Sequence, residues 1–489
     1  MIQSTIHALL SKLRNKEITS VALVQTYLDE IEKQKELNVY ITVCAESALK
    51  AANEADKRYA NGTERKLEGI PLAFKDLYCT NGVRTTAASK ILENFVPFYE
   101  STVTQKLLDE GAICIGKTNM DEFAMGSMTQ YSHFGPTYNH LKRADGKRLI
   151  PGGSSGGSAV AVGAHLAAGS LGSDTGGSIR QPAAFCGVVG IKPTYGLCSR
   201  FGMIAFASSL DQAGPMAKDV RDAALLLEIM AGHDPKDSTS LDVPIPSYSG
   251  NLKADVKGKN VAVFNECLQD LSADNKKMMD VAIKKLEAGG ATIHYVDFPL
   301  MKETTPVYYI IAPTEASSNL AKYDGVRFGH RAAGNGDVAK ATPNSRAKTR
   351  DLSIDELFSK TRQEGFGDEV KRRILMGTYI LSKGHYDAYY LRAQKIQGVL
   401  RQAFTDLFRN IDVVLAPTTP TPAFALDEIP TDHTSIYLND LYTTAVNLAG
   451  LPAIAFPFGQ SESGLPMGCQ LIGPELSEQT LFDVGSYLT

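Results

Sequence analysis

Cysteine is scarce in this sequence, and the cysteines that it has are not spaced as pairs. Seven of them are scattered over 489 residues, and no two form a C-x-x-C motif. Zinc sites and the disulfide frameworks of secreted domains usually show regular cysteine spacings. We therefore predict neither kind of site and interpret the cysteines as reduced thiols in the core.

The sequence also lacks a long apolar run. No stretch approaches the about 18 consecutive apolar residues of a membrane-spanning helix. The N-terminus lacks the apolar core and small-residue cleavage site of a signal peptide. Because its first sixteen residues carry three basic side chains and no acidic one, a transit peptide is the alternative to a first amphipathic helix. We expect a cytoplasmic bacterial protein without membrane contact, and an organelle stays open.

An excess of positive charge is absent as well. The chain has 50 basic and 54 acidic side chains, which gives a net charge of −4. This balance argues against a free-standing nucleic-acid-binding protein, although contact with RNA through a partner stays open. Hydrophobic residues make up 43% of the chain and charged residues 21%, so a large globular core can form.

Segments with helical apolar spacing alternate with short apolar runs along the chain. The predicted helices span residues 2–16, 20–34, 46–60, 102–111, 219–231, 275–288, 353–363, 368–382 and 386–408. The predicted strands span residues 69–77, 113–116, 260–264, 292–298, 412–416, 453–458 and 468–472. This alternation favours an α/β fold in which helices cover both faces of a mixed central β-sheet.

Two further segments have a distinctive composition. Residues 329–350 are polar, basic and glycine-containing, which is typical of a mobile surface loop. The last residues, 482–489, fit an amphipathic helix that packs on the body of the protein.

Residues 152–196 differ from the rest of the chain. These 45 residues hold 12 of the 42 glycines but only three charged side chains, Asp174, Arg180 and Lys192. Glycine permits close backbone approach and unusual φ angles. We therefore expect a buried centre in which backbone amides point at a ligand.

Two serine-containing motifs in this segment can carry nucleophilic chemistry. They are GGSSGGS at 152–158, with Ser154, and DTGGSIR at 174–180, with Ser178. Serine needs a base, and Lys75 at the end of an apolar strand can supply one if burial keeps it neutral. Its neighbour Asp76 must then point elsewhere.

The backbone of the second motif predicts an oxyanion hole. A run of amides at Thr175, Gly176, Gly177 and Ser178 precedes a helix, where N–H groups can stabilise a developing negative charge. Such a site typically contributes about 3–4 kcal/mol to catalysis.

The glycine- and serine-rich motifs have other interpretations. A simple turn or phosphate cradle is the more frequent role of such a stretch. A nucleotide P-loop is excluded, because neither motif has the lysine of G-x-x-x-x-G-K-[ST]. Residues 152–156 match the G-x-S-x-G elbow of α/β-hydrolases, but Pro151 precedes them where an apolar strand is needed. The histidines that such a triad would need, His233, His330 and His385, lie in no distinctive motif.

The blocks at 69–76, 151–196 and 199–216 together resemble the amidase signature family, and the resemblance runs nearly end to end. It implies one amidase domain over 1–489, with a helical segment of about 1–65 packed on it. It also implies a Ser–Ser–Lys triad with Ser178 as the nucleophile that forms the acyl-enzyme. Ser154, after a cis peptide bond, matches the bridging serine, and Lys75 matches the base.

Within that family the blocks at 116–127, 365–390 and 437–452 are similar to the A subunits of glutamyl-tRNA(Gln)/aspartyl-tRNA(Asn) amidotransferases. The resemblance implies that Arg373 holds the α-carboxylate of glutamine and that Asp440 holds its α-ammonium, which suits the chemistry of both groups. Arg373 could instead lie on a solvated helix face, with Arg372 as the next candidate. Asp440 could instead cap the helix through Val446.

The same resemblance implies partner subunits, which would carry out the remaining steps of the reaction. Ammonia from glutamine would pass to a B subunit, which binds ATP, Mg²⁺ and the mischarged tRNA, and a small C subunit would wrap around both. No cofactor or metal is expected on this chain. A stand-alone amidase acting on another amide and a catalytically silent scaffold are the alternatives.

Overall fold

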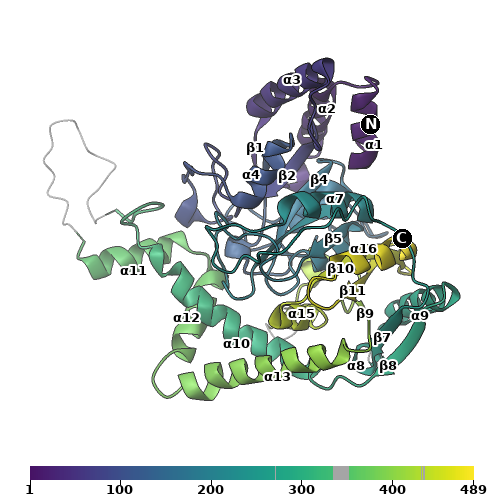
Figure 1. Ribbon diagram of the computed structural model, residues 1–489. Helices are drawn as coiled ribbons and strands as arrows, with labels where there is room; N and C mark the ends of the chain where they lie inside the picture. The colour runs from purple at the N-terminus through teal and green to yellow at the C-terminus, as the bar shows by residue number, and fades with distance from the viewer. Residues whose placement is uncertain (270, 334–351, 431, 433–435) are drawn as a thin grey trace, which may run out of the picture.

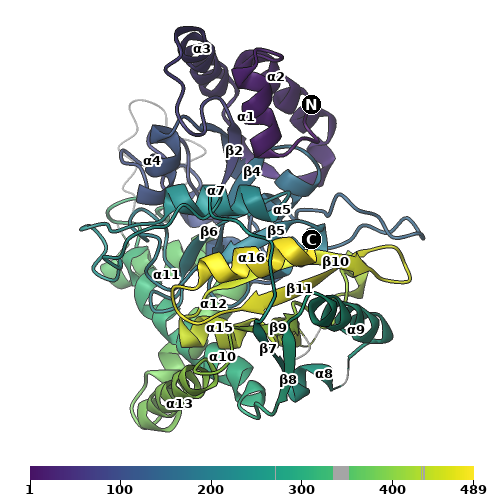
Figure 2. The same ribbon diagram turned by 45° about the vertical axis from the view of Figure 1, so that its right-hand side comes forward.

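The computed structural model describes residues 1–269, 271–333, 352–430, 432 and 436–489, and within them one mixed sheet of 11 strands runs through the molecule (Figures 1 and 2). The strand order is β1-β3-β2-β4-β6-β5-β10-β11-β9-β7-β8. The strands are β1 Tyr40–Val43, β2 Pro71–Lys75, β3 Ile113–Thr118, β4 Gly169–Asp174, β5 Val189–Lys192, β6 Gln212–Ala217, β7 Asn260–Phe264, β8 Thr292–Val296, β9 Val413–Pro417, β10 Ala453–Gln460 and β11 Pro466–Ile472.

Parallel pairing on one side of the sheet sets up the site described below. β2 pairs in parallel with both β3 and β4, and the register places Phe74 opposite Leu171. The carboxyl ends of neighbouring parallel strands meet at the same edge of a sheet. Lys75 at the end of β2 therefore lies at the same edge as Ser173 and Asp174 at the end of β4.

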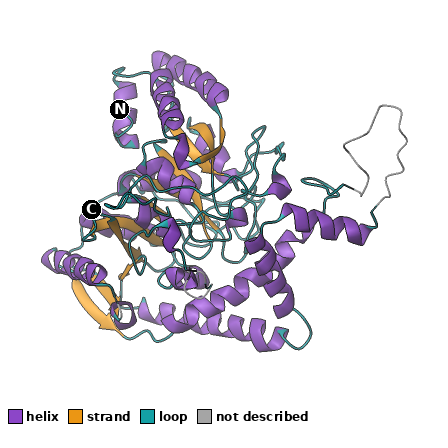
Figure 3. Ribbon diagram, turned by 180° about the vertical axis from the view of Figure 1, so that it is seen from behind, coloured by secondary structure: helices purple, strands orange, loops and turns teal. Residues whose placement is uncertain are grey.

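Helices cover both faces of this sheet (Figure 3). The helices are α1 Ile6–Arg14, α2 Ser20–Lys33, α3 Ala45–Asn61, α4 Thr102–Asp109, α5 Gly156–Gly163, α6 Arg180–Cys186, α7 Val220–Met230, α8 Asn265–Leu268, α9 Ala273–Ala288, α10 Met301–Asn319, α11 Ile354–Gly365, α12 Asp368–Ile380, α13 Arg392–Leu407, α15 Thr444–Ala449 and α16 Glu478–Leu488. The predicted α/β class with a helix-covered mixed sheet is confirmed.

The helices α10, α12 and α13 lie together at the opposite end of the molecule from α1, α2 and α3 (Figure 1). α10 runs along α12, and the backbone carbonyl of Pro313 in α10 comes so close to Gly377 in α12 that a Cβ there would lie 2.1 Å from it. The long helices of this layer position the side chains discussed below.

Most predicted elements form where they were expected, with three instructive differences. The first helix begins at Ile6 rather than residue 2, because the Thr5 side chain caps it by accepting from the Ala8 N–H at 3.3 Å. The helix predicted over 386–408 begins with a π-helical turn at Tyr386–Leu391 before α13. α10 was not predicted at all, because it contains Pro306 and Pro313.

The terminal and loop predictions have different outcomes. α16 packs Leu481, Phe482, Val484 and Leu488 against the core, as predicted for the C-terminus. Of the loop predicted over 329–350, residues 334–350 lie outside the described part of the chain. In the described residues no helix is long and apolar enough to cross a membrane, and no cluster of His, Cys, Asp or Glu could hold a metal ion.

A cluster of phenylalanines should account for much of the stability at the β7–β8 end of the sheet. The buried Phe404 of α13 contacts the rings of Phe264 and Phe298, with centroid separations of 6.2 and 4.8 Å. We expect Phe404→Ala to lower the free energy of unfolding by about 3–5 kcal/mol, because it leaves a cavity in a packed core. Urea unfolding measures this, and Phe98→Ala is the control. Since Phe98 is 87% exposed, its removal should change stability by less than about 0.5 kcal/mol.

Candidate active site

Lys75 ends strand β2 in full burial, with its ammonium group facing a ring of hydroxyls. Its Nζ lies 2.7 Å from Ser154 Oγ, 2.8 Å from Ser155 Oγ and 2.9 Å from Ser173 Oγ. Among the described residues no carboxylate oxygen lies within 4 Å of this nitrogen. Burial lowers the pKa of Lys75 to about 7, against the opposing fields of Asp121, Asp174 and Asp211. A neutral amine that can accept a proton is therefore available near pH 7.

Asp76 points away from this cluster, as predicted. Its carboxylate accepts a hydrogen bond from the Thr86 N–H at 2.9 Å and another from the Thr86 hydroxyl. It also lies 3.6 Å from the buried ammonium group of Lys117. The negative charge next to Lys75 in sequence is thus directed to another cation.

Ser154 lies in the loop before α5, and the Gly153–Ser154 peptide bond is cis, as the resemblance implies. The Ser154 carbonyl accepts from the Asp121 N–H at 3.2 Å. The Asp121 carboxylate in turn accepts from the N–H groups of Met128, Thr129, Gln130 and Tyr131 at 2.8–3.3 Å. These contacts fix the loop that carries Ser154.

Ser178 lies in the turn between β4 and α6, beside the loop of Ser154. Its carbonyl accepts from the Ser155 N–H at 3.2 Å. Ser178 is 9% exposed, whereas Ser154 and Lys75 are fully buried. The Lys75–Ser154 contact and this backbone bond therefore bring the segments of Lys75, Ser154 and Ser178 together, with Ser178 the most exposed of the three.

The turn of Ser178 is held by a buried ion pair between Asp174 and Arg180. Arg180 Nε and Nη2 donate to the Asp174 carboxylate at 3.0 and 3.1 Å, and both side chains are fully buried. The Asn447 amide also donates to Asp174 at 2.9 Å. Although burial disfavours the charge, Arg180 lowers the pKa of Asp174 to about 2.

The backbone amides of the predicted oxyanion hole differ in what they contact. The Gly177 N–H donates to Asp174 Oδ1 at 2.8 Å, so it is not available to a substrate oxygen in this structure. In the described part of the chain the N–H groups of Gly176 and Ser178 have no acceptor. Thr175 is oriented through its hydroxyl, which donates to Asp211 at 2.6 Å. Gly177 has a φ of +132°, and a Cβ there would lie 2.3 Å from Thr443 Oγ1, so only glycine fits.

Arg373 is buried on the inner side of α12, and Arg372 is not. Arg373 is 4% exposed and lies over the rings of Tyr309 and Phe206 at 5.4 and 5.6 Å. Its Nε donates to Glu369 at 2.7 Å. Within the described residues its two terminal nitrogens have no hydrogen-bond acceptor. Arg372 is directed instead to Glu369 and to the hydroxyl of Tyr437.

Asp440 does not cap a helix, because α15 begins later, with Thr443 at its N-cap position. Its carboxylate is buried and accepts from the Tyr309 hydroxyl at 2.8 Å. Burial raises the pKa of Asp440 to about 7, against the effects of Tyr309 and Arg373. Three residues further on, Thr443 donates to the Gly176 carbonyl at 2.6 Å. Asp440 therefore lies beside the turn that carries Ser178.

Several residues of this site were not predicted from the sequence. Tyr309 contacts both Arg373 and Asp440, but it lies in the proline-containing helix α10 that the apolar pattern did not reveal. Ser155 and Ser173 lie within the glycine-rich segment. Its composition predicted a buried centre but did not indicate which side chains contact Lys75. Their contacts with Lys75 became visible only in the folded chain.

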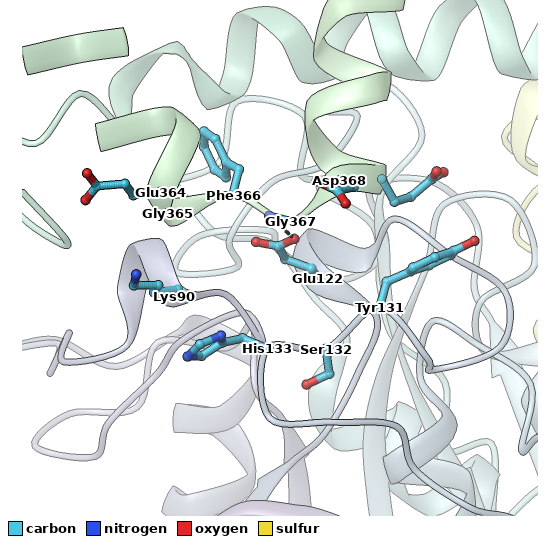
Figure 4. A pocket seen from close by; sticks show the side chains of 11 residues that line it. Lys90, Glu122, Tyr131, Ser132, His133, Glu364, Gly365, Phe366, Gly367 and Asp368 are labelled. Carbon is cyan, nitrogen blue, oxygen red and sulfur yellow. Dashed lines mark hydrogen bonds between the residues drawn. The ribbon is translucent and has the colours of Figure 1, made fainter. Parts of the chain in front are cut away.

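A cavity of about 370 Å³ lies between the segment 131–133 and the start of α12. Figure 4 shows Glu122 facing Gly367, with Tyr131 and His133 on one side and Glu364 and Asp368 on the other. Glu369, the partner of Arg373, also lines it. Ser178 is not among its lining residues.

Comparisons with known proteins place these residues in context. The sequence profile of the Amidase family matches residues 22–482. The chain is 52% identical to the A subunit of glutamyl-tRNA(Gln) amidotransferase from Gluconobacter oxydans, covering 97% of this chain and 93% of that protein. It is 53% identical to the protein of the same name from Thermosynechococcus vestitus, covering 98% and 96%.

Solved structures with this fold include two different kinds of amidase. The A subunit of glutamyl-tRNA(Gln) amidotransferase from Thermotoga maritima superimposes with a TM-score of 0.78 at 37% identity, covering 100% of this chain and 94% of that one. Native peptide amidase of Stenotrophomonas maltophilia gives 0.79 at 29% identity, covering 99% and 96%.

The ionisation of Lys75 should control the reactivity of Ser178. We expect labelling of the chain by an alkyl fluorophosphonate to accelerate as the pH rises through about 7, because only neutral Lys75 can accept the serine proton. Lys75→Met should lower the labelling rate by about 10²–10⁴-fold. Lys192→Met is the matched control. Burial also lowers the pKa of Lys192 to about 7, but its ammonium group donates to the Pro193 carbonyl. Loss of the pH dependence in Lys192→Met rather than in Lys75→Met would show that the base is misassigned.

Proposed function

This chain belongs to the amidase family, and from that membership and its site we propose that it hydrolyses glutamine as the A subunit of a tRNA-dependent amidotransferase. Ser178 is the nucleophile, Ser154 the proton bridge and Lys75 the base. Arg373 and Asp440 bind the α-carboxylate and α-ammonium groups of glutamine. The high identity to curated A subunits over nearly the whole chain supports this assignment.

One observation carries the choice of substrate. Arg373 and Asp440 are buried groups of opposite charge that both contact Tyr309 beside the turn of Ser178. The terminal nitrogens of Arg373, unpaired in the described structure, suit a bidentate carboxylate. A free amino acid carries a carboxylate and an ammonium group on one carbon atom, whereas a simple amide carries neither.

The acylation step uses the three residues in turn. Neutral Lys75 takes a proton from Ser154, and Ser154 takes one from Ser178. At the same time Ser178 Oγ forms a bond to the side-chain amide carbon of glutamine. The oxygen of the tetrahedral intermediate accepts hydrogen bonds from the backbone around Gly176 and Ser178. When the C–N bond breaks, the proton held by Lys75 returns through Ser154 to the nitrogen, and ammonia leaves.

Deacylation repeats the cycle with water as the nucleophile. Lys75 takes a proton from water through Ser154, and the resulting hydroxide attacks the ester carbon. Breaking the C–Oγ bond returns the proton to Ser178 and releases glutamate. The Asp174–Arg180 pair holds the Ser178 turn in place throughout.

Ammonia is then supplied to partners rather than released to solvent. We assign activation of the tRNA-bound carboxylate, with ATP and Mg²⁺, to a B subunit, and a role in holding the complex together to a C subunit. The tRNA is Glu-tRNA(Gln), Asp-tRNA(Asn) or both. A stand-alone amidase acting on other amides is the alternative, since peptide amidase shares the fold.

Glutamate release from glutamine tests this function directly. We expect the chain assembled with B and C subunits to hydrolyse glutamine, and Ser178→Ala to lower kcat by at least about 10³-fold, because the nucleophile is lost. Ser209→Ala is the control, since Ser209 lies outside the centre and bonds Glu315. Full activity of Ser178→Ala, or hydrolysis only of amides without an amino-acid end, would contradict the proposal.

The neighbouring arginines allow a matched test of the carboxylate site. We expect Arg373→Met to lower kcat/KM for glutamine by at least about 10²-fold, because two hydrogen bonds to a charged group are lost. Arg372→Met removes the same charge one residue away. It should cost less than about fivefold, because Glu369 still holds Arg373 through Nε. Steady-state glutaminase assays measure both. An equal loss in both variants would indicate a general electrostatic effect rather than a specific contact.

A further inference from the structure

Glu122 is a buried carboxylate that the proposed mechanism does not use. It follows Asp121 in the loop that fixes Ser154, and it is 3% exposed. A buried carboxylate needs hydrogen-bond partners to offset the loss of hydration. The partners of Glu122 lie on two segments that are far apart in the sequence.

One partner lies on the catalytic side of the molecule. The Ser89 hydroxyl donates to Glu122 Oε1 and also lies 3.3 Å from the Gly365 carbonyl at the end of α11. Ser89 lies three residues after Thr86. The Thr86 N–H donates to the carboxylate of Asp76, the residue that follows Lys75. The segment beyond β2 is therefore joined through Ser89 to Glu122.

The other partner is the first turn of α12. The Gly367 N–H donates to Glu122 Oε2 at 2.9 Å, and Figure 4 shows this bond among the residues that line the cavity. Gly367 is the N-cap residue of α12 and has no side chain to cap the helix. Glu122 accepts from the N–H of the N-cap residue itself, as a Glu or Gln at position N3 does in a capping box; α12 has Val370 at that position. A carboxylate here also suits the positive end of the helix.

The helix that Glu122 caps carries Arg373 and its partner Glu369. Glu369 lies in the first turn, two residues after Gly367, and fixes Arg373 through Nε. A shift of the first turn would move Glu369 and thereby turn the guanidinium group away from Tyr309. Helix position and arginine orientation are coupled in this way.

We propose that Glu122 is a positioning residue that, by capping α12, orients Arg373 for the carboxylate of the substrate. The inference rests on the proposed function, because it takes glutamine as the ligand of Arg373. Glu122 acts through the helix and does not touch the substrate. The Ser154 side of the loop is held independently by the four amides around Asp121, so removal of Glu122 affects the arginine side.

Glutamine kinetics of the assembled complex test this role. We expect Glu122→Ala to raise KM for glutamine about tenfold while kcat changes less than about threefold, because binding and not the serine chemistry is disturbed. Glu122→Gln keeps an acceptor for the Gly367 N–H and should restore KM to within about threefold of the wild type. Labelling by an alkyl fluorophosphonate, which has no carboxylate, should be unchanged in both variants.

Gly367→Ala tests the same contact from the other side. A Cβ at this exposed position would lie 2.5 Å from Glu122 Oε2, while the φ of −71° suits alanine. We expect it to raise KM as Glu122→Ala does. Glu364→Gln is the matched control, because Glu364 lines the same cavity but its partly exposed side chain bonds His330. Its KM should equal that of the wild type.

Each outcome distinguishes the two proposals. An unchanged KM in Glu122→Ala, or equal losses in fluorophosphonate labelling and glutamine turnover, would overturn the positioning role while leaving the glutaminase function intact. A raised KM in Glu364→Gln would point to the charge of the cavity instead of the cap. A wild-type complex that is labelled but does not hydrolyse glutamine would overturn the proposed function and this inference together.

Discussion

The buried ion pair between Asp174 and Arg180 is the constraint on which the site depends. Asp174 ends β4 and Arg180 begins α6, so their pairing closes the turn that contains Ser178. Arg180 also donates to the Thr443 carbonyl and to the Gln470 side chain, which ties the turn to α15 and β11. Removal of one partner of a buried pair commonly costs about 3–5 kcal/mol, because the other charge is left without compensation. The buried pair therefore fixes the conformation of the nucleophile turn.

The same burial has the opposite effect on Lys75. Arg180 compensates the charge of Asp174 and keeps it ionised, whereas Lys75 faces hydroxyl groups that cannot compensate a cation fully. Desolvation consequently favours the neutral amine. The carboxylate nearest to Lys75 in sequence, that of Asp76, contacts Lys117 and Thr86 and therefore does not stabilise the charged form of Lys75. One desolvated region thus holds a permanent ion pair for structure and a neutral base for proton transfer.

Much of the fold was predictable because amphipathic helices and apolar strands leave periodic patterns in the sequence. Several elements escaped this logic, among them β1, β5 and β6. For two others, β4 and α10, the physical reason is clear. β4 consists of Gly, Ser, Asp and a single Leu, so its sequence lacks the apolar residues that would predict a strand buried on both faces. α10 contains two prolines, yet its packing along α12 compensates for the lost hydrogen bonds. The assignment of one domain over the whole chain, with a helical segment of about residues 1–65, stays a prediction.

The sequence alone determined which side chains could carry the chemistry. Ser154 and Ser178 lie in glycine- and serine-rich motifs, and Lys75 ends an apolar run. That local composition already implied burial near backbone amides. Only the tertiary structure decided that Arg373 faces inward while Arg372 does not. The two side chains are separated by about 100° around the helix axis, so the packing of α12 determines which of them is buried. It also decided that the Gly177 amide is engaged and that Tyr309 joins the site. Such assignments depend on contacts between residues far apart in the chain, which no local pattern encodes.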